Sequence, residues 1–305
     1  MFFKSPITGS NNIVLEREIF SSFIVDEYKK ELGIDVSKFF HHIDKIFIYK
    51  CLDTGYRFYH PFNVSGDNSF YQELEKFPWY YMNCKWEYGV ASPFIKKNDK
   101  VLEIGCAQGS FLQKIKEAGG TAEGLEMNLR AREVCEKKGL NVQAVSIEKF
   151  SENKASTYDM ICFFQVLEHI TDVQSLLSSS LFALKPGGLI IASVPNNDCF
   201  MFKSNDIILN MPPHHMGLWN ISSLVKLQNY FNMKIESIYL EPLQKYHLGF
   251  ANKIVEKVVR EKLQQKMSFF STIIEKVARR FAFLGVSAVS DYIIGHSIVI
   301  VFRKK

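Results

Sequence analysis

The sequence predicts an α/β fold: a Rossmann-like, seven-stranded, mostly parallel sheet with helices on both faces. From about residue 98 onward, short apolar runs alternate with segments of helical periodicity, and such alternation builds a parallel sheet covered on both faces. Several helical segments stop at glycine, as helices commonly do. The chain has 305 residues, 47% hydrophobic and 23% charged, which suits one large α/β domain with a smaller attachment.

The predicted strands are mostly short apolar runs. YDMICFFQV is apolar almost throughout, which is typical of a central parallel strand buried on both faces. The predicted strands are residues 101–104, 121–127, 141–147, 158–166, 189–195, 233–243 and 296–305.

Helical spacing of apolar residues fills the gaps between these strands. Phe111, Leu112 and Ile115 share one face of a helix that Gly119 ends. The other predicted helices are residues 129–139, 171–188 and 221–231, the second of them closing on Pro186 and two glycines. Ligands bind beyond the carboxyl ends of parallel strands. The functional loops are therefore expected near Gly105, Glu126, Val145, Phe164 and Val194.

Two further regions complete the predicted organisation. Residues 1–97 form a separate N-terminal region, rich in aromatic residues, in which FYQELEKFPWYYMNCKWEYG predicts one or two lead-in helices. Residues 98–305 form the sheet domain, with a helical insertion at 246–290 before the last strand. The apolar face of that insertion leaves three roles open: packing on the domain, packing in a homo-oligomer, or peripheral contact with an anionic membrane. It combines Ile273, Ile274, Val277 and Phe281 with flanking Lys276, Arg279 and Arg280.

Composition narrows the cellular setting and the partners. None of the six cysteines forms a C-x-x-C pair, which predicts buried thiols and a reducing compartment. We find no signal peptide and no stretch of ~20 apolar residues, and we predict a cytoplasmic protein without a transmembrane segment. The net charge of +5 is small and scattered, which argues against a nucleic-acid polymer as a partner.

The first predicted loop has the pattern of a nucleoside-binding site. VLEIGCAQG places Gly105 and Gly109 between a strand and a helix, where glycine lets a ligand approach backbone N–H groups. Glu126 ends the second strand, where a carboxylate accepts hydrogen bonds from a ribose diol. Ala107 occupies the second position of the dinucleotide fingerprint and no third glycine follows, which disfavours a dehydrogenase. Glu103 would repel a pyrophosphate and attract an ammonium group.

Four motifs extend this pattern to a family. VLEIGCAQG, GLEMN, YDMICFFQVLEHI and LKPGGLIIASVPN resemble, in order and spacing, those of class I S-adenosylmethionine-dependent methyltransferases over roughly residues 98 to 240. The resemblance implies S-adenosylmethionine as the cofactor, with Glu126 on its ribose, Met127 against its adenine, and Glu103 near its methionine part. The cofactor-binding residues it implies are Glu103, Gly105, Cys106, Ala107, Gln108, Gly109, Glu126, Met127, Ser146, Ile147, Phe164, Gln165 and Val166. Two positions depart from the family pattern: Ala107 replaces a glycine, and Ser146 stands where aspartate is frequent.

Histidines beyond two strand ends are the candidates for acceptor chemistry. A hydroxyl acceptor benefits from a base that takes its proton during methyl transfer. Glu168 and His169 follow the fourth strand, while His214 and His215, in MPPHHMGLW, follow the fifth. We predict His169, His214 and His215 as catalytic residues. Framing of the cofactor pocket and binding of the acceptor are the alternatives.

No metal site is predicted from this pattern. Pro212 and Pro213 are expected to hold their loop extended. On an extended chain the adjacent side chains of His214 and His215 point apart, and no Asp or His partner has ligand spacing.

A sugar hydroxyl is the predicted acceptor, on a nucleotide-linked sugar or a surface-glycan precursor. The aromatic segments before the core, together with MPPHHMGLW, resemble methyltransferases of bacterial surface-polysaccharide and sugar-modification pathways. The acceptor residues are predicted to be Tyr80, Tyr81, His214, His215 and Trp219. The alternatives are a small-molecule, quinone-type or N-methyltransferase, which would need an apolar cleft if the acceptor were a quinone, and a non-catalytic nucleoside-binding subunit.

Two N-terminal turns, SPITGS and CLDTGYRFYHP, resemble degenerate C-x-x-C-G knuckles of the kind that opens some sugar methyltransferases. Ser5, Thr8 and Thr54 stand where cysteines would be, and only Cys51 remains. We therefore expect the shape of such a segment without its metal.

Overall fold

The computed structural model describes residues 3–202, 207–264 and 290–305. Its main element is a seven-stranded sheet in the order β10-β11-β8-β7-β4-β5-β6. Strands β4 to β8 pair in parallel, whereas β11 pairs antiparallel to both β8 and β10. The strands are β4 (Lys100–Ile104), β5 (Thr121–Leu125), β6 (Asn141–Gln143), β7 (Tyr158–Phe164), β8 (Leu184–Pro195), β10 (Met233–Pro242) and β11 (Ile294–Lys304). The predicted fold class is confirmed.

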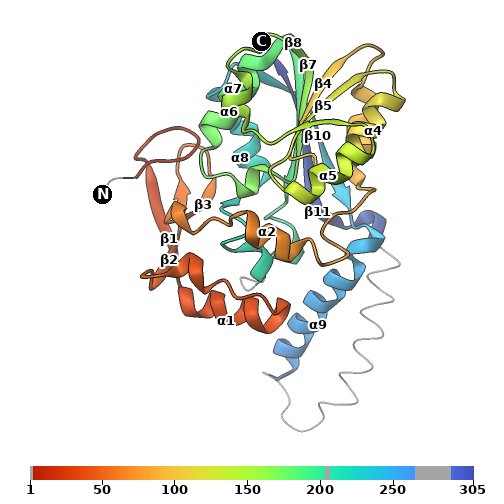
Figure 1. Ribbon diagram of the computed structural model, residues 1–305. Helices are drawn as coiled ribbons and strands as arrows, with labels where there is room; N and C mark the ends of the chain where they lie inside the picture. The colour runs from red at the N-terminus through yellow and green to blue at the C-terminus, as the bar shows by residue number, and fades with distance from the viewer. Residues whose placement is uncertain (1–2, 203–206, 265–289) are drawn as a thin grey trace.

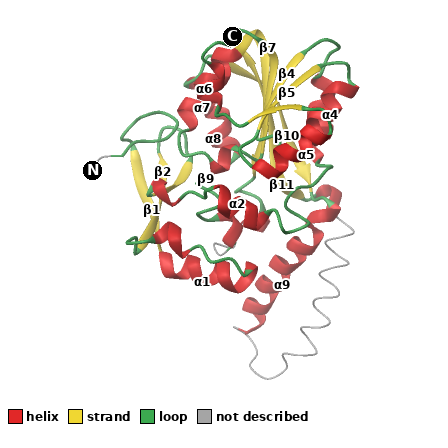
Figure 2. Cartoon of the chain, viewed as in Figure 1, coloured by secondary structure: helices red, strands yellow, loops and turns green. Residues whose placement is uncertain are grey.

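Helices cover both faces of this sheet (Figures 1 and 2). One face carries α4 (Ser110–Glu117) and α5 (Leu129–Lys137), and the other carries α6 (Ile147–Ser151), α7 (Val173–Ala183) and α8 (Ile221–Lys226). The two-residue period of a strand explains the division. In β7, Ile161 and Phe163 belong to the core under α6 and α7, while Met160 and Cys162 belong to the core under α4 and α5.

Two local predictions differ from the structure. The segment 184–188 was predicted to close a helix, but α7 ends at Ala183 and β8 begins at Leu184. Leu184 is fully buried and pairs with Tyr158 of β7, so burial against the sheet outweighs the helix-stop pattern at this point. The short helix α6 was not predicted; the side chain of Ser146 caps it by accepting a hydrogen bond from the Lys149 N–H.

The N-terminal region folds as a second sheet rather than only as lead-in helices. Its order is β1-β2-β3-β9, all antiparallel, and its last strand comes from far along the chain. The strands are β1 (Ile13–Phe20), β2 (Lys45–Cys51), β3 (Arg57–His60) and β9 (Gly217–Leu218). Helices α1 (Ser21–Leu32), α2 (Asn68–Leu74) and α3 (Trp86–Ala91) complete the region. The small sheet, α1 and α2 gather at one end of the large sheet (Figure 1).

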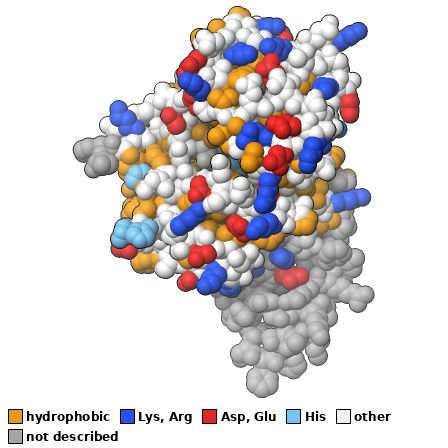
Figure 3. Space-filling model, viewed as in Figure 1, with side chains coloured by type: hydrophobic (Ala, Val, Ile, Leu, Met, Phe, Trp, Pro, Cys, Tyr) orange, Lys and Arg blue, Asp and Glu red, His pale blue; other side chains and the backbone are white. Residues whose placement is uncertain are grey.

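The helical insertion is described only in part. Helix α9 spans Leu248–Gln264, and the amphipathic residues predicted between 273 and 281 lie outside the described residues. Among the described residues, none of the helices is long and apolar enough to cross a membrane. On the face shown in Figure 3, basic and acidic side chains are interspersed across the described surface.

Candidate functional site

The loop after β4 makes the tight turn that the sequence predicted. Gly105 and Gly109 have φ angles of 70° and 77°, and Ala107, a non-glycine residue, has a φ of 46°. The Ala107 N–H donates to Glu126 Oε2 at 2.9 Å, and the Asn128 N–H donates to Oε1 at 2.8 Å. The carboxylate at the end of β5 therefore fixes the loop after β4. This contact accounts for an alanine in left-handed backbone.

Two carboxylates flank this loop, of which Glu103 is buried and Glu126 is half-buried. Glu103 is 1% exposed, and its Oε2 has no hydrogen-bond partner among the described residues. Burial raises the pKa of Glu103 well above its ordinary value, and the positive charge of Lys85 opposes that rise. Burial also raises the pKa of Glu126, while backbone N–H donors lower it. The site thus holds one carboxyl that is hydrogen-bonded by the backbone and one whose Oε2 lacks a partner within the described part of the chain.

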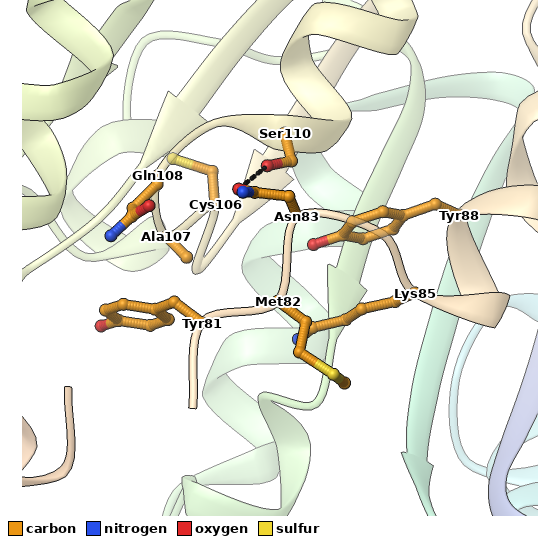
Figure 4. Close-up of a pocket in the computed structure, with 9 residues that line it drawn as sticks. All are labelled: Tyr81, Met82, Asn83, Lys85, Tyr88, Cys106, Ala107, Gln108 and Ser110. Atoms are coloured by element: carbon orange, nitrogen blue, oxygen red, sulfur yellow. Dashed lines mark hydrogen bonds between the residues drawn. The ribbon is translucent and has the colours of Figure 1, made fainter. Parts of the chain in front are cut away.

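A cavity of about 240 Å³ opens beside the loop (Figure 4). One wall is the loop after β4, and the other is the segment between α2 and α3, which crosses it. Ser110 Oγ donates to Asn83 Oδ1 at 3.1 Å and joins the two walls. The lining residues are Tyr81, Met82, Asn83, Lys85, Tyr88, Cys106, Ala107, Gln108 and Ser110. Five of these residues were not predicted as site residues: Met82, Asn83, Lys85, Tyr88 and Ser110. Ser110 directly follows the predicted loop. The other four reach the loop only through the tertiary fold, and no local motif marks them.

The remaining predicted cofactor residues are placed in three settings. Met127 and Ser146 are exposed, whereas Ile147 and Phe164 are buried in the cores on opposite faces of the sheet. Gln165 has a φ of 57° directly after β7. Val166 lies under the first loop, where a Cβ on Gly105 would meet its Cγ2.

His169, His214 and His215 come together in a compact cluster. Their ring centroids are 4.5 to 5.0 Å apart, and His214 stacks on His215 with an interplanar angle of 20°. The Nδ1 atoms face oxygen acceptors: His214 O for His169, Leu209 O for His214, and Asn210 Oδ1 for His215. Burial lowers the pKa of all three, to about 4 for His169, so the neutral imidazoles predominate near pH 7.

The expectation that His214 and His215 point apart is wrong. The N–H groups of both residues bond to the carbonyl of Met211, so the stretch is a turn and not an extended chain. This turn places the two rings on the same side. The argument against a metal site therefore loses its geometric basis.

The histidine turn, residues 211–216, is held between the two sheets. Met216 N–H donates to the Glu168 carbonyl at 2.7 Å, and Tyr59 N–H donates to the Met216 carbonyl at 2.9 Å. Glu168 itself is 1% exposed, and its Oε2 lacks a partner among the described residues. Burial raises the pKa of Glu168 to about 8. Tyr80 also reaches the cluster, with its hydroxyl 3.5 Å from His214 Nε2.

Trp219 lies elsewhere. It has no exposed surface and packs against Tyr56, with ring centroids 4.2 Å apart. The structure therefore places this predicted acceptor residue in the core, against the N-terminal region. The sequence did not separate it from the preceding histidines because all three share one short apolar stretch.

A polar network lies at the carboxyl ends of β7 and β8. Gln165 Nε2 is 3.3 Å from each of Glu87 Oε1, Ser193 Oγ and Ser297 Oγ. Glu87, Ser193 and Ser297 are buried. A buried network of this kind is stable only because its members satisfy one another.

The two N-terminal turns face each other. Thr8 Oγ1 lies 3.9 Å from Cys51 Sγ, and hydrogen bonds from Ser5 and Thr54 lower the pKa of the Cys51 thiol against the effect of burial. Gly9 and Gly55 take positive φ angles in the two turns. Hydroxyl side chains thus occupy three of the four positions where a C-x-x-C-G knuckle pair would carry cysteines, and Cys51 occupies the fourth.

Comparisons with known proteins agree with this geometry. A family model described as a methyltransferase domain matches residues 79–238. Ubiquinone biosynthesis O-methyltransferases are similar to part of this chain. The enzyme of Actinobacillus pleuropneumoniae serotype 5b is 33% identical over 107 residues, which cover 32% of this chain and 46% of the relative. The enzyme of Salmonella newport is 30% identical over 105 residues, which cover 32% of this chain and 43% of the relative. The match thus spans less than half the length of these relatives.

The fold is also found among solved structures. A complex between the Haloferax volcanii Trm112 methyltransferase activator and a methyltransferase contains a chain that aligns with a TM-score of 0.50 and 12% identity, covering 72% of this chain and 89% of that one. The family model starts at residue 79, inside the region predicted to precede the domain, and includes part of the segment that covers the first loop. Since the model matches more than half of the 305 residues, this chain belongs to the methyltransferase-domain family.

Proposed function

We propose that this chain is an S-adenosylmethionine-dependent O-methyltransferase whose acceptor is a hydroxyl of a sugar, either nucleotide-linked or part of a glycan precursor. When bound, S-adenosylmethionine supplies a methyl group already activated by its sulfonium. The protein then has to bind the nucleoside, orient the acceptor and manage one proton.

The unpartnered carboxyl of Glu103 supports the choice of cofactor. A buried polar atom without a hydrogen bond is costly, and an ammonium group is the partner that a carboxylate needs. Glu126 keeps free lone pairs beside the backbone N–H groups it accepts, and these suit a ribose diol. A pyrophosphate would meet two carboxyls at the same loop, which disfavours a dinucleotide.

The polar network of Gln165, Glu87, Ser193 and Ser297 carries the choice of acceptor. It occupies the carboxyl edge of the sheet, where ligands bind in this architecture. Gln165 is half-buried whereas its three partners are buried, so a hydroxyl-rich molecule would exchange hydrogen bonds with the Gln165 amide. Tyr80 adds an aromatic face beside the histidine cluster. A quinone-type acceptor would be served better by aliphatic side chains.

Glu168 and His169 are the groups best placed to accept the hydroxyl proton. The raised pKa of Glu168, about 8, lies near the range that suits a general base. His169 is fixed by its Nδ1 bond to the His214 carbonyl. We propose Glu168 as the proton acceptor, with His169, His214 and Tyr80 binding the acceptor.

A phenolic hydroxyl is the second candidate acceptor. It is favoured by the relatives named ubiquinone biosynthesis O-methyltransferases, and it uses the same hydroxyl chemistry. An N-methyltransferase is less favoured, because an amine that arrives neutral needs no base.

One experiment separates these functions. The full chain is first titrated with S-adenosylhomocysteine by calorimetry, and then incubated with methyl-labelled S-adenosylmethionine and three acceptor panels: nucleotide sugars, catechols and primary amines. We expect the chain to bind S-adenosylhomocysteine and to transfer the labelled methyl group to a member of the nucleotide-sugar panel. Label only in the catechols selects the phenolic function. Absence of binding at millimolar ligand selects the non-catalytic subunit.

A further inference from the structure

The histidine cluster, defined as His169, His214 and His215, has a geometry that acceptor binding alone does not require. One ring nitrogen of each lies within 4.8 Å of those of the other two, and this group is drawn from the described residues. The three residues come from two segments, η4 (Leu167–His169) and the histidine turn. Their proximity is therefore a product of the fold and not of sequence spacing.

The hydrogen bonds of the cluster fix which nitrogen of each ring is available. Each Nδ1 faces an oxygen that only accepts, at 2.6 Å for His169, 2.9 Å for His214 and 3.0 Å for His215. Each Nδ1 must therefore carry the proton, which leaves the lone pair on Nε2. The Nε2 of His214 faces the Tyr80 hydroxyl at 3.5 Å, and a bound ion would take the place of this contact. Metal-ligating histidines show the same arrangement, in which the outer N–H is held by a carbonyl or amide oxygen.

The outer partners are themselves held in place. Asn210 presents Oδ1 to His215 because its Nδ2 donates to Asn197 Oδ1 at 2.8 Å. Its backbone carbonyl accepts from the Tyr59 hydroxyl. This orients the Asn210 amide, and through it the His215 ring, from two directions.

We propose that the Nε2 atoms of His169, His214 and His215 bind one divalent transition-metal ion with the preferences of Zn²⁺. Three neutral imidazoles suit Zn²⁺ or Co²⁺ and not Mg²⁺. Three protein ligands leave the fourth tetrahedral position for water or a substrate oxygen.

Charge and access at the cluster agree with this assignment. The Glu168 carboxyl, with Oε1 4.0 Å from His169 Nε2, adjoins the proposed ion, and a bound cation would favour its ionised form. His169 is 18% exposed, which gives the ion a route from solvent. Ligand atoms of one Zn²⁺ ion lie about 3.4 Å apart when the Zn–N distance is about 2.1 Å. The ring nitrogens, which lie within 4.8 Å of one another, would therefore have to approach by up to about 1.4 Å.

Direct metal binding tests the proposal without any methyl acceptor. The untagged full chain is stripped with a chelator and titrated with Co²⁺, whose visible absorption reports tetrahedral coordination, and Zn²⁺ is then added as a competitor. We expect one equivalent of Co²⁺, displaced by Zn²⁺ and not by Mg²⁺. Wild-type protein that binds neither Co²⁺ nor Zn²⁺ would overturn the proposal.

Variants distinguish the cluster from adventitious histidines. His169→Ala and His215→Ala should each weaken Co²⁺ binding more than roughly 100-fold, and Asn210→Ala, which removes only the outer partner, by roughly 10- to 100-fold. His41→Ala/His42→Ala removes an exposed adjacent pair and should change nothing. The assignment is contradicted if the His41→Ala/His42→Ala control loses its equivalent of bound Co²⁺. It is also contradicted if both cluster variants fold and still bind Co²⁺.

Folding and the nucleoside site are monitored separately. Binding of S-adenosylhomocysteine should persist in the cluster variants, because the first loop does not contact these rings. If His215→Ala fails to fold, His215→Gln and Asn210→Ala provide the same comparison. A variant that loses the metal but still binds S-adenosylhomocysteine thus separates the metal site from the nucleoside site.

Discussion

At the scale of single residues, Glu103 and Glu126 flank the same loop but have different environments. Glu126 accepts two backbone N–H bonds, whereas Glu103 has an unpartnered oxygen in a fully buried position. If Glu126 holds the ribose and Glu103 the ammonium group, the two residues contact different parts of the same ligand. Ligand truncation can then separate their roles.

Glu126→Ala should weaken both S-adenosylhomocysteine and 5′-methylthioadenosine by about 1–3 kcal/mol, because both ligands carry the ribose diol. Glu103→Gln should weaken only S-adenosylhomocysteine, by about 1.5–3 kcal/mol, because methylthioadenosine lacks the amino-acid part. Calorimetric titration of both variants with both ligands measures these differences. Equal losses for the two ligands in Glu103→Gln would refute the assignment of that carboxyl.

Glu241 predicts a pH dependence of stability. Burial raises its pKa to about 7, while Tyr246 donates to its Oε1 at 2.7 Å and its Oε2 is unpartnered among the described residues. A carboxyl whose folded pKa exceeds the unfolded value of about 4.3 loses stability as pH rises from that value through 7. Glu241→Gln should therefore gain stability relative to wild type across this window, by at most about 3 kcal/mol.

Urea unfolding of both proteins between pH 4 and 8 checks this. Burial lowers the pKa of the neighbouring His247 to about 4, and its Nδ1 lies 3.8 Å from Glu241 Oε2. The comparison is therefore repeated in a His247→Gln background, which separates the carboxyl from the imidazole. Parallel stability curves for the two proteins would mean that Glu241 ionises normally.

Single residues also show where sequence analysis succeeds and where it stops. Glu103, Gly105 and Glu126 follow from local spacing around two strand ends, and the structure brings them to one loop. Lys85 and Asn83 lack any such signal, because they reach the loop through a long-range contact. The stacking of His214 on His215 depends on the turn closed by the Met211 carbonyl, which proline content alone does not reveal.

At the scale of elements, β9 is only two residues long but joins the two sheets. Gly217 and Leu218 pair with Phe58 and Arg57 of β3, directly after the histidine turn. Alternation with helices and glycine stops predicted the strands of the large sheet, of which β4, β7 and β8 are mostly buried. β1 was not predicted: its apolar residues are grouped at its two ends and do not alternate with polar ones, although most of the strand is exposed or half-buried.

Gly217→Ala should destabilise the protein by about 1–3 kcal/mol, the scale of overpacking in a filled core. A Cβ at this position would overlap the hydroxyl of Tyr56, which is 1% exposed and packed between Phe58 and Trp219. Thermal unfolding provides the measurement.

Two comparisons control this prediction. Gly249→Ala adds a methyl group where nothing lies within 4 Å, inside α9, and should be neutral or slightly stabilising. Tyr56→Phe removes the overlapping hydroxyl, so the double variant should lose less stability than the two single changes summed. Strict additivity would show that the overlap is not the cause.

The segment between α2 and α3 is the element that limits access to the cavity. Tyr81, Met82 and Lys85 of this segment line the cavity together with the loop after β4, so a nucleoside bound at that loop would contact the segment. Binding of S-adenosylhomocysteine should therefore change amide hydrogen exchange at residues 81–85, while α7 stays unchanged. Identical exchange at 81–85 with and without the ligand would place the nucleoside elsewhere.

At the scale of the whole molecule, part of the small sheet joins the hydrophobic core of the large sheet, whereas Ile46 and Ile48 of β2 lie in a separate cluster with α1. Ile7, Tyr56 and Phe58 of the N-terminal region belong to the same cluster as Leu102 of β4 and Leu224 of α8. The sequence predicted a boundary at residue 97 from a change in pattern, and that division stays a prediction. A shared core cannot be inferred from such a change, because it depends on which distant faces meet.

A shared core predicts a single unfolding transition. Phe58→Ala removes a ring that is 1% exposed and should cost about 3–5 kcal/mol, although the residue lies outside the parallel sheet. Because the cluster spans both sheets, the tryptophan fluorescence and far-ultraviolet dichroism curves in urea should shift together and stay coincident. Phe182→Ala, in α7 and 50% exposed, should shift them far less. Separation of the two curves in Phe58→Ala, with the dichroism midpoint unmoved, would show instead that the N-terminal sheet unfolds independently of the large sheet.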